Sequence, residues 1–568
     1  MNNRFTYEAI VIGGGMSGSY AAKELCDQGI DTLLLERGRD VKHREDYPTA
    51  NKMPWEFEHR GQMPLAVREA NPSIARCYAY REDNAHFFVK DSEHPYIQEK
   101  PFDWIRGYQV GGKSLMWARQ TQRWSDFDFE GPARDGFAVD WPIRYKDLAP
   151  WYDKVEDFVG IAGNKDGIPE LPDGDFLPAW ERNVVEKYFT DVVAKNYKNR
   201  HVIFSRCAHL SKPRQHHLDQ GRGQCLNRTE CERGCPFGAY FSANSSTIPY
   251  ALQTGKLSLR PHSVVESILF DEKTNTATGV RVIDALTKEV VEYKAKVIFV
   301  NAGAINTSLL LLNSKSGRFP NGIGNDSELL GKYLAFHNYR ATISAKHEGH
   351  KNFRTEGRLP TSSYLPRFRN VRRQETDFLR GYAAGFYAGR GWVNPEARGL
   401  GQSLADQMLP ADKILSDHWS VGSHMMGETI PKAESTVALD AERTDEWGMP
   451  LVRIKVDYDD NDRKMTQDFF EQFTEMYERA GFVDIETHDS ERIPGLDIHE
   501  MGGVRMGRDP RTSLLNGWNQ LHACPNVIVT DGACMTSTST QNPSLTYMAL
   551  AARAADHAVR QLKRGELG

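Results

Sequence analysis

Three cysteines, Cys225, Cys231 and Cys235, lie close together in a chain of 568 residues. Eight cysteines in all are too few for a disulfide scaffold, so this crowding needs its own explanation. Three interpretations stay open on the residues alone: an iron–sulfur cluster, a zinc site completed by His216 or His217, and a disulfide that leaves one thiol over. Zinc ligand pairs are usually separated by about two to four residues, and the wider first gap here argues mildly against zinc.

A second group of residues could bind a dinucleotide. Gly13, Gly15 and Gly18 form a Gly-x-Gly-x-x-Gly turn directly after the apolar run 8–12, and Glu36 ends the next apolar run. In such a unit Gly13 permits the tight turn, Gly15 lets the backbone approach a pyrophosphate, and Gly18 lets the helix pack on the strand. Glu36 would accept a hydrogen bond from a ribose hydroxyl.

The elements that must position these residues form an α/β pattern. Buried strand-like runs recur at 297–303 and 527–532, and an alanine-rich helix is predicted over 543–562. Short strand-like runs between 336 and 457 predict an antiparallel sheet. We expect a nucleotide-binding domain mainly in 1–335 with a loop and cysteine insertion at 205–240, a substrate-binding domain in 336–490, and a return to the first domain in 491–568.

Composition excludes several classes of partner. The net charge is -5 and no long run of like charges occurs, which argues against nucleic acid and anionic membranes. The most apolar long stretch, 297–312, is interrupted by Asn301 and Asn306 and is too short to cross a bilayer. The first residues lack a signal-peptide pattern, so we expect no export signal on the chain itself.

The chain resembles the glucose–methanol–choline (GMC) oxidoreductase family, flavoenzymes that oxidise alcohols. The resemblance covers nearly the whole length and rests on residues 13–18 with Glu36, 110–117, 301–307, 322–334, 499–507, 531–532 and 542–546. It implies an α/β fold with a Rossmann-like FAD-binding domain and an antiparallel-sheet substrate domain. The residues implied to bind FAD are Gly13, Gly15, Gly18, Glu36, Gly111, Gly112, Ala302, Gly303, Asp531 and Gly532. Pyranose oxidases tether FAD through a histidine where this chain has Met116, so we expect non-covalent FAD.

The resemblance also implies the catalytic pair. Oxidation of an alcohol by hydride transfer requires a base for the hydroxyl proton. In this family a histidine is paired with a second histidine or an asparagine, which here are His499, in a His-x-x-Gly-Gly-x-x-Met segment, and Asn542. Asn542 could instead be a plain helix cap. His424 and Glu428 could contact a polyol, but packing roles are at least as plausible and neither is expected to be catalytic.

The cysteine segment resembles one in bacterial sugar dehydrogenase large subunits, where a similar Cys-x5-Cys-x3-Cys-Pro segment holds a [3Fe-4S] cluster. Some relatives have an extra cysteine where this chain has Leu226, which removes no ligand. The resemblance implies a dehydrogenase of the glucoside 3-dehydrogenase type, which oxidises glucosides or disaccharides to 3-keto sugars and passes electrons to a cytochrome c-type acceptor. The alternatives are an oxygen-using sugar or alcohol oxidase with a structural cysteine segment, and a lyase that keeps FAD structurally.

The same resemblance leads to an expectation about where the protein works in the cell. Such dehydrogenases usually deliver electrons outside the bacterial inner membrane, whereas this chain shows no signal of its own. We therefore expect a small partner subunit that carries an export signal and brings the folded chain to the periplasm. A cytoplasmic enzyme with a soluble acceptor is the alternative.

Overall fold

The computed structural model describes residues 5–228, 231–353, 360–392, 415–491 and 493–567. Its largest sheet has eight strands. Five of them run parallel in the order β22 (Cys524–Val529), β10 (Val290–Val300), β1 (Phe5–Ile12), β2 (Thr32–Leu35) and β7 (Leu257–Arg260). β21 (Gln520–Leu521) forms the edge, and β8 (Ser263–Asp271) and β9 (Thr276–Asp284) extend β10 in antiparallel pairing.

Helices cover this sheet because its strands are apolar on both faces. The side chains of Ile10 and Leu33 enter one hydrophobic cluster and those of Val11 and Leu34 enter another. α1 (Met16–Asp27) packs on α14 (Ser544–Lys563), which packs on α6 (Tyr145–Val159). The first and last segments of the chain therefore build one unit, as the strand pattern predicts.

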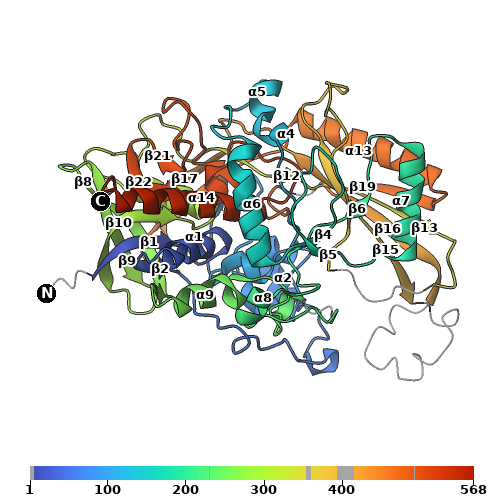
Figure 1. Cartoon of the computed structure of the whole chain (residues 1–568), viewed down its shortest axis with the longest axis horizontal. Coiled ribbons are helices and arrows are strands. Elements are labelled where there is room, and N and C mark those ends of the chain that lie inside the picture. The colour runs from blue at the N-terminus through green and yellow to red at the C-terminus, as the bar shows by residue number, and fades with distance from the viewer. Residues whose placement is uncertain (1–4, 229–230, 354–359, 393–414, 492, 568) are drawn as a thin grey trace.

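A seven-stranded sheet stands at the other end of the molecule (Figure 1). Its strands are β19 (Val483–Asp489), β13 (Ala341–His347), β16 (Leu415–Glu428), β15 (Tyr382–Trp392), β14 (Ser363–Leu365) and β6 (Ile203–Phe204), with β12 (His337–Asn338) paired to β16. α13 (Asp460–Arg479) and α7 (Val184–Asn196) pack their aromatic residues on it.

The 336–457 segment does not form one sheet. β17 (Thr436–Thr444) and β18 (Pro450–Lys455) belong to a separate five-stranded sheet with β11 (Lys332–Ala335), β20 (Met501–Gly503) and β3 (Ile97–Gln98). The physical reason is packing: Val437, Val452 and Ile454 bury their side chains against Ile305 of α10 (Ala304–Asn313), on the side of the nucleotide-binding sheet.

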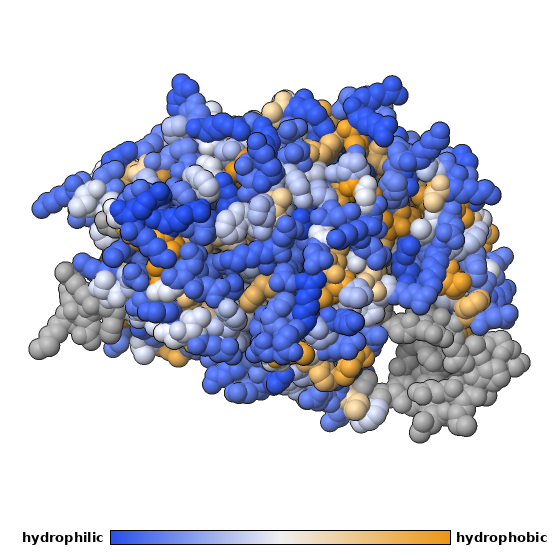
Figure 2. Space-filling view, in the orientation of Figure 1, coloured by the Kyte–Doolittle hydropathy of each residue, from blue (hydrophilic) through white to orange (hydrophobic). Residues whose placement is uncertain are grey.

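The outer surface is mainly hydrophilic on the face in Figure 2, where apolar residues form scattered patches. In the part of the chain that the structure describes, none of the helices combines the length and hydropathy needed to span a membrane.

Candidate active site

A cavity of about 740 Å³ lies where the parallel strands end and the seven-stranded sheet begins, a size at the upper part of the usual range for small-molecule sites. Ligands of open α/β sheets bind at the carboxyl ends of the strands. The wall contains residues that follow β1, β10 and β22, namely Gly13, Gly15, Asn301, Ala302, Gly303, Asp531 and Gly532. The opposite wall contains Tyr387 of β15 and His424 of β16.

The glycine turn after β1 has the geometry that its spacing predicts. Gly13 has φ +98, and a Cβ there would lie 2.3 Å from the carbonyl oxygen of Asn301. A Cβ on Gly18 would lie 2.0 Å from the carbonyl oxygen of Gly13. A Cβ on Gly15 would meet no protein atom within 4 Å, because Gly15 faces the cavity. Gly13 and Gly18 thus allow close packing within the protein, whereas Gly15 leaves room for a ligand.

Glu36 closes the turn from the tip of β2. Its two carboxylate oxygens accept hydrogen bonds from the backbone nitrogens of Gly14 (2.9 Å) and Gly38 (3.0 Å). Burial raises the pKa of Glu36, and these backbone donors oppose the shift. Glu36 also lines the cavity, and each oxygen keeps a second lone pair that could accept from a ribose hydroxyl.

Two further loops join the turn. The backbone nitrogen of Gly111 donates to the carbonyl of Gly14 (3.1 Å), and a Cβ on Gly112 would lie 3.2 Å from the Cα of Gly15. Gly112 faces the cavity, whereas Gly18 and Gly111 lie behind its wall. Met116, the residue on which the expectation of non-covalent FAD rests, also lines the cavity.

Asp531 ties the ends of β22 and β10 together. Its carboxylate accepts from the backbone nitrogens of Gly303 (2.8 Å) and Ala533 (2.9 Å) and from the hydroxyl of Thr307 (2.6 Å). Burial raises the pKa of Asp531 to about 6. The hydrogen bonds that the carboxylate accepts order the loop that carries Ala302 and Gly303.

The residues present fit FAD. Several buried polar atoms of the residues that line the cavity have no hydrogen-bond partner among the described residues, and they include Asn301 Nδ2, Glu500 Oε1, Asn542 Oδ1 and Tyr547 Oη. Buried polar groups are normally hydrogen-bonded, so these atoms call for a polar ligand or water. Pro543 and Ser544, at the N-terminus of α14, also line the cavity, where the helix dipole favours negative charge.

His499 and Asn542 meet at this wall although 43 positions separate them. His499 Nε2 lies 3.2 Å from Asn542 Nδ2. The N-cap of α14 is Pro543, and among the described residues no side chain caps this helix, so Asn542 contacts His499 and does not cap the helix.

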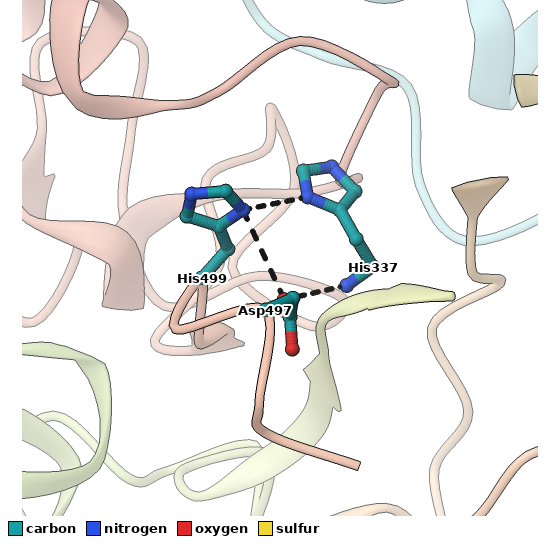
Figure 3. Close-up of side chains that lie close together, drawn as sticks. All are labelled: His337, Asp497 and His499. Atoms are coloured by element: carbon teal, nitrogen blue, oxygen red, sulfur yellow. Dashed lines mark hydrogen bonds and ion pairs between the residues drawn. The ribbon is translucent and has the colours of Figure 1, made fainter. Parts of the chain in front are cut away.

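A second histidine, His337 of β12, contacts His499 from behind the wall. Figure 3 shows one nitrogen of each ring pointing toward the other ring, with Asp497 below them. Their Nδ1 atoms are 2.9 Å apart, and Asp497 Oδ2 lies 3.9 Å from His499 Nδ1. Sequence reasoning missed His337, because no local motif relates positions 162 residues apart.

Burial keeps both imidazoles neutral. It lowers the pKa of His337 to about 4 and holds the pKa of His499 well below its ordinary value, with His337 and Lys113 adding to the shift of His499. Lys113 is itself paired with Glu500 at 2.7 Å. Burial raises the pKa of Asp497 to about 7. A neutral imidazole facing a cavity can accept a proton.

The two residues considered for contact with a polyol, His424 and Glu428, lie in different surroundings. His424 lines the cavity beside Tyr339, with ring centroids 5.3 Å apart. Glu428 is fully buried and accepts from Arg380 (2.8 Å) and Arg367 (3.3 Å) behind the wall. Glu428 therefore belongs to a buried cluster of ion pairs and does not line the cavity.

The three clustered cysteines line a second, smaller cavity of about 30 Å³, with room for a group larger than one water. His209 lines it too, is 1% exposed, and neither of its ring nitrogens has a hydrogen-bond partner in the described ranges. His216 and His217 instead contact the backbone carbonyl of Asp157 (3.0 and 2.9 Å) and do not line this cavity. The structure thus does not bring the two proposed zinc histidines to the thiols.

The two cavities share a wall. Tyr240 lines the small cavity and Trp117 the large one, and the Trp117 backbone nitrogen donates to the Tyr240 hydroxyl at 3.1 Å. Glu232, the neighbour of Cys231, lines the large cavity and pairs with Arg119 at 3.0 Å. A group held by the cysteines would therefore lie next to a ligand of the large cavity.

Comparison with known proteins gives a consistent assignment. Residues 7–338 and 431–551 match the two models of a family described as GMC oxidoreductase. The 2-methyl-1,2-propanediol dehydrogenase of Mycolicibacterium austroafricanum is 29% identical, over 98% of this chain and 95% of its own. The fructose dehydrogenase large subunit of Gluconobacter japonicus is 26% identical, over 99% of this chain and 100% of its own.

The fold also matches a solved structure. Pyridoxine 4-oxidase from Mesorbium loti superposes with a TM-score of 0.60 at 16% identity, covering 98% of this chain and 99% of that one. This likeness confirms the predicted fold class of a Rossmann-like domain joined to an antiparallel-sheet domain.

Proposed function

The chain belongs to the GMC oxidoreductase family, whose members act on CH–OH groups with FAD, and from this premise we propose that it is a sugar dehydrogenase. Its substrate would be a glucoside or disaccharide, oxidised at the C3 hydroxyl to a 3-keto sugar. FAD, when bound non-covalently in the large cavity, supplies the acceptor for the hydride.

His499 and Asn542 would handle the hydroxyl. The neutral His499 imidazole accepts the hydroxyl proton as the carbon–hydrogen bond breaks, which leaves a ketone and a protonated imidazole. Asn542 Oδ1 has no hydrogen-bond partner in the described ranges and can orient the hydroxyl, while its amide Nδ2 contacts His499.

The opposite wall suits a molecule with several hydroxyls. Tyr339, Tyr387 and His424 offer ring faces and polar atoms, and Glu186 of α7 adds a carboxyl group whose pKa burial raises to about 7. The relatives include a fructose dehydrogenase and the gluconate 2-dehydrogenase flavoprotein of Pantoea cypripedii, which is 24% identical. Both names support a sugar or sugar acid as the substrate class.

The contact between the linings of the two cavities is the observation that supports a dehydrogenase. We propose that Cys225, Cys231 and Cys235 hold a [3Fe-4S] cluster. Three thiols surround one cavity with the buried His209, whose ring nitrogens have no hydrogen-bond partner among the described residues, and this set fits a metal group better than an apolar packing site. Electrons delivered to FAD as a pair could then leave singly across the Trp117–Tyr240 contact.

The last part of the proposal concerns the partner subunit and the external protein that accepts the electrons. The fructose dehydrogenase relative is named a large subunit, which supports a partner subunit for this chain. We propose that a small subunit carries the export signal, that the complex works in the periplasm, and that a cytochrome c-type protein accepts the electrons. A cytoplasmic enzyme with a soluble acceptor is the competing arrangement, and fractionation of the native host separates the two.

One experiment tests the reaction. The purified protein is titrated without oxygen with a panel of glucosides, free sugars and simple diols while the flavin absorbance is followed, and products are identified by NMR. We expect glucosides to bleach the flavin and to give 3-keto products. Bleaching by diols alone would overturn the sugar assignment, and stoichiometric hydrogen peroxide in air would favour an oxidase.

A further inference from the structure

We propose that His337 is a positioning residue that fixes the tautomer of His499, so that the bare nitrogen of His499 faces the cavity. The inference deepens the proposed function, because it rests on His499 as the base. His337 is fully buried and does not line the cavity, so it acts through His499 and not on the substrate.

The first step concerns the far side of the His337 ring. Its Nε2 lies 3.2 Å from the carbonyl oxygen of Thr538 and 3.1 Å from that of Ser539. Carbonyl oxygens only accept hydrogen bonds, so Nε2 must carry the proton and donate it. A neutral imidazole has one N–H, and Nδ1 of His337 is therefore a bare acceptor.

The second step transfers this constraint to His499. The two Nδ1 atoms lie 2.9 Å apart, a hydrogen-bond distance that needs one proton between them. Because Nδ1 of His337 is bare, the proton belongs to Nδ1 of His499. In neutral His499 the other nitrogen, Nε2, is then bare and faces Asn542 and the cavity. The Asn542 amide Nδ2 at 3.2 Å is a donor, which agrees with a bare Nε2.

The surroundings hold His337 in this pose. The backbone nitrogen of His337 donates to Asp497 Oδ2 at 2.9 Å, and β12 pairs with β16 through His337 and Glu428. The backbone carbonyls that accept from the ring belong to the segment just before Asn542, so the same loop constrains both partners of His499. A ring that turned over would lose its hydrogen bonds to both carbonyls.

A rival interpretation assigns the same three side chains to a metal ion. His337, Asp497 and His499 each place one ligand atom within 4.8 Å of the others. Both Nδ1 atoms would then have to be bare, and neutral His499 would carry its proton on Nε2. The two interpretations therefore predict opposite tautomers of His499.

The experiment reads the tautomer directly in the FAD-loaded enzyme. Protein labelled with ¹⁵N-histidine is examined by NMR at neutral pH, with His499→Gln used to assign the His499 signals. We expect the Nδ1–H form of His499 in the wild type and at least partial conversion to the Nε2–H form in His337→Leu. An Nε2–H signal in the wild type, or a bound metal ion in a one-to-one ratio, overturns the inference.

Turnover gives the second measurement. Loss of the group that fixes a tautomer in a serine-protease triad lowers kcat about 10⁴-fold, and we expect His337→Leu to keep yellow FAD and lose at least about 100-fold in kcat. His337→Asn, which keeps an acceptor near the Nδ1 position, should recover at least about tenfold of this loss. His347→Leu, a histidine of β13 outside both cavities, is the control and should retain turnover.

The outcomes are distinguishable. Equal turnover in His337→Leu and the wild type, or no recovery by His337→Asn in folded, FAD-loaded protein, contradicts the role of His337. If His337→Leu does not fold, the wild-type tautomer and His337→Asn still decide. Normal turnover in His499→Ala would instead refute the proposed base, whatever tautomer the wild type shows.

Discussion

The hydroxyl of Tyr240 lies 3.1 Å from the backbone nitrogen of Trp117, so a residue of the cysteine cavity touches a residue of the cofactor cavity. The Tyr240 hydroxyl also donates to the Trp117 carbonyl at 3.3 Å, and Tyr240 is buried. Two contacts to one backbone segment make this a fixed connection. Two redox groups, one in each cavity, would therefore keep a constant distance and orientation relative to each other.

The first prediction concerns the cysteines. Cys231→Ser should lose iron and the paramagnetic signal of the oxidised cluster, because the thiolate is the ligand. Substrate should still reduce the flavin, since the large cavity is intact, but transfer to a one-electron acceptor should fall to background. Metal analysis and stopped-flow absorbance measure the two effects, and Cys77→Ala, outside both cavities, is the control. Zinc without iron in the wild type would contradict the cluster.

The second prediction concerns the base. His499→Ala should retain FAD, because the glycine turn and Asp531 are untouched, and should lose at least about 100-fold in kcat. Steady-state turnover with the best glucoside is the measurement. His522→Ala, whose ring lies outside the cavity beside Ser513, should leave turnover unchanged. Near-normal turnover in folded His499→Ala would move the base to another residue.

Sequence reasoning reached the features that are local along the chain. The steric roles of Gly13, Gly15 and Gly18 follow from spacing within one turn, and the structure places them accordingly. It could not reach His337, which meets His499 only because β12 returns beneath the loop before α14. Nor could it foresee that Glu428 is enclosed by arginines, since strand partners and buried ion pairs depend on distant segments.

The third prediction concerns pH. Burial, His337 and Lys113 lower the pKa of His499, so the base should be neutral throughout the neutral range. Asp497 Oδ2 lies 3.9 Å from His499 Nδ1, and Glu500, the next residue along the chain, is paired with Lys113. As pH falls through the lowered pKa, His499 gains a proton and cannot act as a base, so kcat/KM should decline on the acid side only below the ordinary value of about 6.5.

Lys113→Met tests the sign of this effect. Removal of the cation leaves Glu500 unpaired near His499, and both changes favour the protonated imidazole, so the acid limb should move to higher pH. Profiles of kcat/KM for wild type and variant are compared in the same buffers. An acid limb above neutrality in the wild type, or a downward shift in Lys113→Met, would contradict the electrostatic argument.

The last prediction separates the roles of two glycines three positions apart. Gly15 has φ -77, which alanine tolerates, and its Cβ would project into the cavity without meeting protein. Gly15→Ala should therefore keep the thermal stability of the FAD-free chain but weaken FAD binding. In Gly18→Ala the Cβ would lie 2.0 Å from the carbonyl of Gly13, so α1 must shift, at a cost of about 1–3 kcal/mol in the free energy of unfolding. Thermal unfolding with and without added FAD, together with FAD titration, measures both. Equal loss of stability in the two variants would contradict this division of roles, in which Gly18 serves packing and Gly15 leaves space for the cofactor.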